Sequence, residues 1–131
     1  VTKSDAKNGA VTLVKLTNKN EKKFTVPASV KVDGVSFKVT EISKNAFKNN
    51  KKLKQVTIGK NVTKIGANAF NGDSKLKKIT IQSKVLNKVG KNAIGRIYRK
   101  AVIKVPKSKV NAYKKKFTKK TGFQKSMKLT K

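Results

Sequence analysis

The chain has 131 residues, the length of one domain, with 35 Lys and Arg against 5 Asp and Glu, and its formal net charge is +30. It contains no Cys, which excludes disulfides and zinc–thiolate sites, and no His, which removes the commonest general base and metal ligand. No run approaches the roughly 18 apolar residues of a membrane span, so the sequence contains no candidate transmembrane segment.

The N-terminal part is expected to form β structure that caps one end of the fold. Residues 10–16 alternate partly between apolar and polar side chains, and residues 17–23 are expected to form a polar turn. Apolar residues then alternate over residues 30–39 on both sides of Asp33 and Gly34. An Asp-Gly pair between two alternating runs predicts a β-hairpin.

The middle of the chain contains a repeat of 23 residues. Residues 39–47, VTEISKNAF, return as residues 62–70, VTKIGANAF, and the same offset relates Leu53 to Leu76. A weaker copy follows at an offset of 24, and residues 24–30 match residues 56–62. Self-similarity at a fixed period of this length predicts a solenoid.

Each repeat is predicted to contribute one strand with an apolar and a polar face. Val56 and Ile58 point to one side of such a strand, and Gln55 and Thr57 point to the other. Val62 and Ile65 are expected to return over the apolar face, with Phe70 filling the remaining space. One repeat cannot bury this face alone, whereas stacked copies can, with their strands forming a parallel sheet.

The C-terminal part is predicted to form a helix over residues 108–120, with Ser108 as its N-cap and Gly122 as its stop. Its apolar side chains share one face at helical spacing: Val110, Tyr113 and Phe117. We expect this helix to cover the open end of the solenoid. The alternative is a basic amphipathic helix that lies on a membrane surface. Met127 and Leu129 suggest one further strand.

The repeated motif Ile42-Ser-Lys-Asn-Ala-Phe47, seen again as Ile65-Gly-Ala-Asn-Ala-Phe70, resembles the BspA-type leucine-rich repeat family over about residues 24–106. The resemblance implies an α/β fold: a short leucine-rich-repeat solenoid with a parallel sheet of stacked strands, an N-terminal β cap with a hairpin and a C-terminal capping helix. Residues 1–131 then form a single domain. We expect the N-terminal cap over residues 1–38, the repeats over 39–106 and the C-terminal cap over 107–131.

The same resemblance implies a bacterial protein that is secreted or exposed at the cell surface and that adheres to other molecules. We therefore expect a non-catalytic interaction module whose partner is a host or cell-envelope protein or a glycan. The alternative is a basic anchor or spacer, which would bind anionic wall polymers through its lysine-rich surface. A nucleic-acid binder is a weaker alternative, because only Arg96 and Arg99 among the basic residues are arginines and few aromatic residues could stack on bases.

No catalytic, cofactor or metal site is predicted. The acidic residues are scattered singly, and Glu41 is expected to pair with a neighbouring lysine while Asp73 belongs to the loop after Phe70. The recurring asparagines are interpreted as turn residues: Asn45, Asn68 and Asn92.

The candidate ligand face consists of the outward side chains of the stacked strands: Thr25, Gln55, Thr57, Lys78, Thr80 and Lys104. A row of threonines flanked by lysine and glutamine could hydrogen-bond an extended or anionic partner. The simpler interpretation is that threonine is a good residue for an exposed strand.

Overall fold

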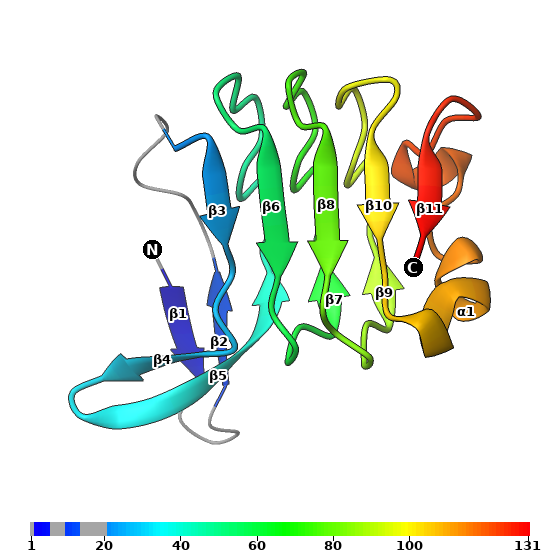
Figure 1. The fold of residues 1–131 in the computed structure, drawn as a ribbon. Coiled ribbons are helices and arrows are strands. Elements are labelled where there is room, and N and C mark those ends of the chain that lie inside the picture. The colour runs from blue at the N-terminus through cyan, green and yellow to red at the C-terminus, as the bar shows by residue number, and fades with distance from the viewer. Residues whose placement is uncertain (1, 6–9, 14–20) are drawn as a thin grey trace.

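The computed structural model describes residues 2–5, 10–13 and 21–131. Successive turns of the chain stack side by side as the coils of a solenoid, with one sheet on each side of a single core (Figure 1). We call the two sheets sheet I and sheet II.

Sheet I confirms the predicted parallel sheet of stacked strands. Its order is β11-β10-β8-β6-β3 and its neighbours are all parallel. Val56 lies opposite both Phe24 and Ile79, and Ile79 lies opposite Ile103, so the register follows the sequence repeat. The strands are β3 (Lys23–Thr25), β6 (Gln55–Ile58), β8 (Lys78–Ile81), β10 (Val102–Lys104) and β11 (Lys128–Thr130).

Sheet II contains the predicted hairpin and also a second parallel ladder that the sequence did not predict. Its order is β1-β2-β5-β7-β9, with β4 paired to β5. Ile65 lies opposite Ile42 and Lys64 opposite Lys88, so the segment expected only to cover the apolar face forms a parallel ladder of its own. The strands are β1 (Thr2–Asp5), β2 (Ala10–Leu13), β4 (Ser29–Val32), β5 (Val35–Ile42), β7 (Lys64–Ile65) and β9 (Lys88–Val89).

The core lies between the two sheets and repeats from coil to coil. Val56, Ile58, Ile79 and Ile81 are each at most 2% exposed, as the stacking of apolar faces requires. Leu53 and Leu76, which precede two of the strands, are buried with them. Val62 and Ile65 are buried as well. Burial of one Val, Leu or Ile side chain contributes about 1.5–3 kcal/mol.

Aromatic rings form a row through this core. The ring centroids of Phe24 and Phe47 are 5.5 Å apart, and those of Phe47 and Phe70 are 4.9 Å apart with the planes nearly parallel. Ile94 continues the row as a buried residue. The predicted core role of Phe70 is therefore confirmed, and Phe47 is buried in the same way.

Two glycines of the repeat allow the coils to come close together. A Cβ on Gly66 would lie 2.4 Å from the Lys44 nitrogen, and one on Gly90 would lie 2.4 Å from the Ala67 nitrogen. Neither glycine has a positive φ. Close backbone approach therefore explains why both positions are glycine. By contrast, Asn45, Asn68 and Asn92 all have positive φ, which confirms them as turn residues.

The predicted hairpin is present between β4 and β5. Val32 pairs with Val35, and Asp33 and Gly34 between them both have positive φ, as a tight hairpin turn requires. Strand β2 pairs in parallel with β5 and so continues sheet II at its N-terminal end. The other parts of the expected N-terminal run and polar turn, residues 14–20, lie outside the described residues.

The predicted helix over residues 108–120 is wrong in extent. The structure has a 3₁₀ turn at Lys107–Lys109, the helix α1 at Val110–Lys114 and a second 3₁₀ turn at Lys119–Thr121. Ser108 is not the N-cap, because α1 begins after Lys109. Gly122 does end the last 3₁₀ turn, with a φ of 99°.

The helix stops early because the chain must continue the stacking of the coils. Thr118 is extended, which brings residues 119–121 beneath the last repeat. There the carbonyls of Lys120 and Thr121 accept hydrogen bonds from the N–H groups of Asn92 and Ile94. The buried Tyr113 hydroxyl donates to the Ser83 carbonyl and accepts from the Leu86 N–H. The C-terminal segment is therefore a cap, as predicted, and β11 pairs with β10 beside it.

We predict that Phe70→Ala lowers the free energy of unfolding by about 3–5 kcal/mol, because the lost ring leaves a cavity in the row of aromatic side chains. Urea denaturation measures the change. Phe70→Leu, which conserves most of the volume, should cost less than about 1.5 kcal/mol. An unchanged stability in Phe70→Ala would contradict the stacking of the rings.

We predict that Gly66→Ala destabilises the chain more than Gly34→Ala does. The new methyl at position 66 would overlap the backbone of the neighbouring coil, whereas at position 34 it meets nothing within 4 Å and only the positive φ is unfavourable. Overpacking costs about 1–3 kcal/mol or more, and left-handed backbone costs an alanine about 1–2 kcal/mol. Thermal unfolding of both variants decides the order, and equal shifts would show that the coils can move apart freely.

Candidate functional site

The predicted ligand face is assembled on the outer side of sheet I. One row across the strands runs Lys23, Gln55, Lys78, Val102 and Lys128. The next row runs Thr25, Thr57, Thr80, Lys104 and Thr130. All six candidate residues therefore lie on one face, in the register that the repeat predicted.

This face is polar and positively charged. Gln55, Lys78 and Lys104 are exposed, while Thr57 and Thr80 are half-buried between their neighbours. Parallel strands lie about 4.8 Å apart, so each row offers hydroxyl, amide or ammonium groups at a regular spacing. The arrangement suits an extended polar partner.

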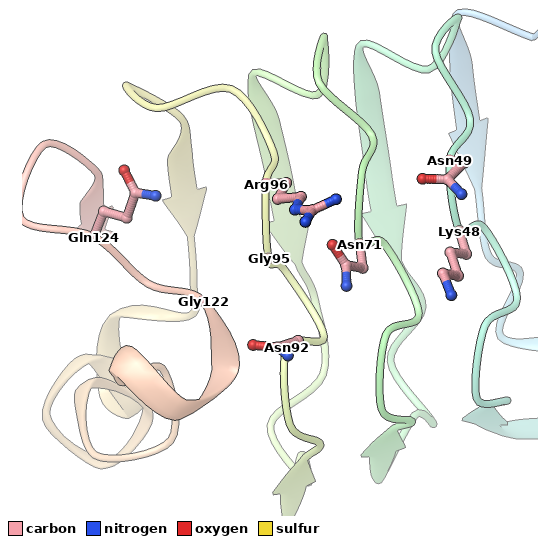
Figure 2. A pocket seen from close by; sticks show the side chains of 8 residues that line it. All are labelled: Lys48, Asn49, Asn71, Asn92, Gly95, Arg96, Gly122 and Gln124. Carbon is pink, nitrogen blue, oxygen red and sulfur yellow. The ribbon is translucent and has the colours of Figure 1, made fainter.

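A second feature, which the sequence did not predict, is a hollow on the flank of the solenoid between the two sheets. Its volume is about 570 Å³. Figure 2 shows the residues that line it. We call it the flank hollow. Eight residues from three successive coils and the C-terminal cap line it: Lys48, Asn49, Asn71, Asn92, Gly95, Arg96, Gly122 and Gln124. Its lining is rich in amides and carries two cations.

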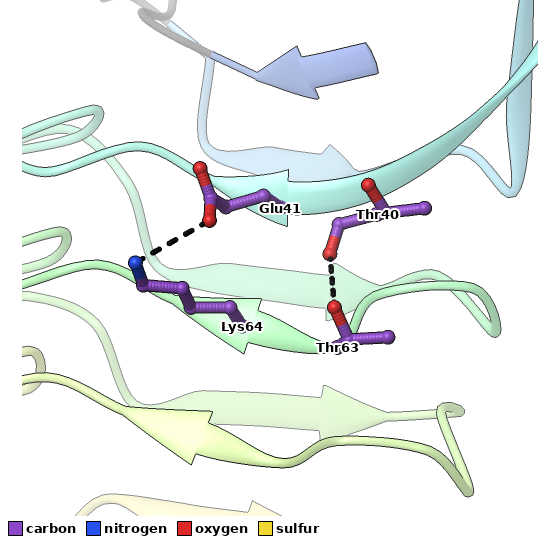
Figure 3. A network of polar contacts seen from close by, with 4 residues as sticks. All are labelled: Thr40, Glu41, Thr63 and Lys64. Carbon is purple, nitrogen blue, oxygen red and sulfur yellow. Dashed lines mark hydrogen bonds and ion pairs between the residues drawn. The ribbon is translucent and has the colours of Figure 1, made fainter. Parts of the chain in front are cut away.

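The outer side of sheet II carries a small polar network (Figure 3). Lys64 Nζ lies 3.5 Å from Glu41 Oε1, which confirms the expected pairing of Glu41 with a lysine. The Thr63 hydroxyl donates to the Thr40 carbonyl at 3.1 Å. Both members of the ion pair are exposed, so the pair contributes at most about 1 kcal/mol. A hollow of about 420 Å³ lies beside it.

Asp73 is completely buried, although the sequence placed it simply in a loop. One carboxyl oxygen accepts the Asn50 N–H at 2.7 Å, and so joins two adjacent coils. The other carboxyl oxygen and the Asn50 side-chain nitrogen have no partner among the described residues. Burial raises the pKa of Asp73 from 3.8 to about 8, while the Asn50 hydrogen bond and the charge of Lys51 oppose the shift. The 23-residue register between Asn50 and Asp73 is the sequence signal that could have revealed this contact.

Over residues 2–5, 10–13 and 21–131, no three His, Cys, Asp or Glu side chains gather into a possible metal site. Across those same residues, no helix is both long enough and apolar enough to cross a bilayer.

Comparison with known proteins identifies the repeat. The family model described as "BspA type Leucine rich repeat region (6 copies)" matches residues 17–129. None of the curated proteins matches the chain.

Solved structures of bacterial proteins share the fold. A leucine rich cell surface protein from Faecalibacterium prausnitzii A2-165 is 29% identical, with a TM-score of 0.65 over 85% of this chain and 32% of its own. A leucine-rich repeat protein from Bacteroides capillosus ATCC 29799 is 19% identical, with a TM-score of 0.67 over 94% of this chain and 88% of its own. The T. pallidum Leucine Rich Repeat protein is 22% identical, with a TM-score of 0.63 over 79% of this chain and 50% of its own.

Two of these structures are of proteins much longer than this chain. The chain spans about a third of the length of the F. prausnitzii protein and half of the length of the T. pallidum protein. At 19% and 22% identity, the B. capillosus and T. pallidum structures show the fold alone.

We predict that the free energy of unfolding falls as the pH rises from about 4 to about 8. In this window the folded chain keeps the Asp73 proton that the unfolded chain has released, so the contribution present below pH 4 is lost as the pH approaches 8. The slope is at most about 1.4 kcal/mol per pH unit. Urea denaturation of the wild type and of Asp73→Asn across this range isolates the effect, because asparagine is isosteric and does not titrate. Parallel pH profiles for the two proteins would show that Asp73 is ionised in the folded state.

Proposed function

Because the chain belongs to the BspA-type leucine-rich repeat family, we propose that it is a non-catalytic, extracellular module that binds a protein or glycan through the outer face of sheet I. The observation that carries this proposal is the alignment of Gln55 with Lys78 and of Thr57 with Thr80 across neighbouring strands. Regular rows of this kind match the repeating groups of an extended partner.

Three further facts support binding rather than catalysis, in an extracellular setting. Proteins of this family are typically non-catalytic and generally surface-exposed or secreted in bacteria. The similar F. prausnitzii structure is that of a leucine rich cell surface protein. The chain also has no His, the commonest general base, and no Cys, one of the common nucleophiles.

The net charge of +30 favours a second candidate function. A surface so rich in lysine attracts anionic wall polymers without any specific groove, and would serve as an anchor or spacer at the cell envelope. Such binding is lost steeply as salt rises, because it rests on the release of counterions. Binding to a specific face depends instead on which lysine is changed.

We predict that Lys78→Glu weakens binding to the protein or glycan partner by about tenfold or more, whereas Lys88→Glu has little effect. Both lysines are exposed strand residues and both variants change the charge equally, but Lys78 lies on sheet I and Lys88 on sheet II. The measurement is surface plasmon resonance on immobilised matrix proteins, wall polymers and duplex DNA at about 50 and about 200 mM salt.

The same titrations separate the candidate functions. Salt-resistant binding to a matrix protein or glycan that Lys78→Glu alone disrupts supports the sheet I module. Equal losses in both variants, with a steep loss of wall-polymer binding between the two salt concentrations, would replace it by the charged anchor. Preference for DNA over the other surfaces would refute both.

A further inference from the structure

The flank hollow exists because side chains become shorter from coil to coil. The 23- and 24-residue register places Lys48, Asn71 and Gly95 at equivalent positions of three successive coils. Gly95 therefore removes the side chain where the first two coils have one. Gly122 of the cap then lies directly on it, because a Cβ on Gly122 would be 2.5 Å from the Gly95 nitrogen. Backbone atoms of Gly95 and Gly122 therefore line the hollow at this end.

Arg96 occupies an unfavourable backbone conformation at the edge of this hollow. Its φ is 56°, and the other described non-glycine residues with positive φ are Asp33 and four asparagines. Asp and Asn tolerate this region because their short side chains bond locally, whereas Arg has no such compensation. The equivalent positions in the two preceding coils are Asn49 and Gly72, the residue types that the conformation favours.

Arg96 is also one of only two arginines among 35 basic residues. Nearly all other positive charges of the chain are lysines. Position 96, whose positive φ disfavours arginine, nevertheless carries a planar guanidinium with five N–H donors. Strain of this kind is retained at functional sites, where the side chain does something that a relaxed residue could not. Figure 2 shows the Arg96 side chain extending from its own coil toward Asn71 on the neighbouring coil.

The other residues that line the hollow indicate the chemistry of a ligand that would fit it. The amides of Asn49, Asn71, Asn92 and Gln124 offer both donors and acceptors, and Asn71 uses one donor on Asn68 at 2.9 Å. No carboxylate and no aromatic ring is among the described residues that line the hollow. Paired donors and acceptors suit the hydroxyls of a sugar or polyol, and the guanidinium suits one carboxylate or phosphate. A base or a neutral sugar would have no ring to stack on.

We propose that the flank hollow is a discrete binding site for one unit of an anionic polyol or glycan, with Arg96 holding the anionic group and the amides holding the hydroxyls. The volume of about 570 Å³ is that of a small-ligand site. The site is separate from the outer face of sheet I, so it does not depend on the partner proposed there. It differs from charge-driven adhesion because it requires a guanidinium at one position.

Isothermal titration calorimetry at about 200 mM salt tests the site with three probes: a tetramer of galacturonic acid, its neutral methyl ester and a short glycerol-phosphate oligomer. The acid tetramer tests a carboxylate source and the glycerol-phosphate oligomer a phosphate source. Saturable binding of at least one of them, and none of the ester, is expected. Absence of binding by both anionic probes, or equal binding of the ester, would overturn the proposal.

The two arginines provide a matched pair of variants. Arg96→Lys keeps the charge and loses the fork, and should weaken binding at least fivefold, while Arg99→Lys and Arg99→Gln should stay within about twofold. Arg99 does not line the hollow. Equal losses in Arg96→Gln and Arg99→Gln would show that charge alone binds the probe.

A variant that stabilises the folded chain shows whether loss of binding comes from the missing guanidinium or from unfolding. Arg96→Asn places the favoured residue type at this φ, and should raise the melting temperature by about 2–4 °C while abolishing binding. Retained binding in Arg96→Asn, or a lowered melting temperature, would refute the role given to Arg96. Binding of a matrix protein to sheet I should be unchanged in every Arg96 variant, so the two proposals fail independently.

Discussion

The close approach of neighbouring coils is the constraint on which the molecule depends. Parallel strands fix the separation at about 4.8 Å, and every inward residue must then pack against its counterpart one repeat away. This explains why Val56 and Ile79 stay apolar, why Phe47 and Phe70 stack, and why Gly66 and Gly90 have no side chain. Stability is therefore a sum of contacts between neighbours, and the two ends require separate caps.

The sequence predicted sheet I and its register because alternating apolar residues recur at one offset over whole strands. It did not predict the β5-β7-β9 ladder of sheet II, because two-residue strands such as Lys64–Ile65 are too short to show alternation. It extended the C-terminal helix too far because Tyr113 and Phe117 keep helical spacing even though the chain turns at Thr118 to continue the hydrogen bonding of the coils. A local sequence pattern does not reveal hydrogen bonds that a segment makes with N–H or carbonyl groups far away in the chain.

The candidate sites show the same division. The six outward residues of sheet I could be predicted because strand alternation fixes the direction of each side chain. The flank hollow could not, because it depends on side-chain length at one position over three coils and on the cap that covers the third. The burial of Asp73 could not be predicted for a related reason: its environment is set by Asn50 on the preceding coil rather than by the residues beside it in the chain.

The aromatic row leads to a different consequence. Phe47 and Phe70 occupy the same place in successive coils, with the same N–H to carbonyl bonds to the coil that follows each of them. Insertion of another complete coil between them would reproduce every one of these contacts and disturb neither cap. A scaffold of this kind can be lengthened by duplication of whole units without redesign of its interior. The length of the solenoid can therefore change in evolution while the packing of its core stays the same.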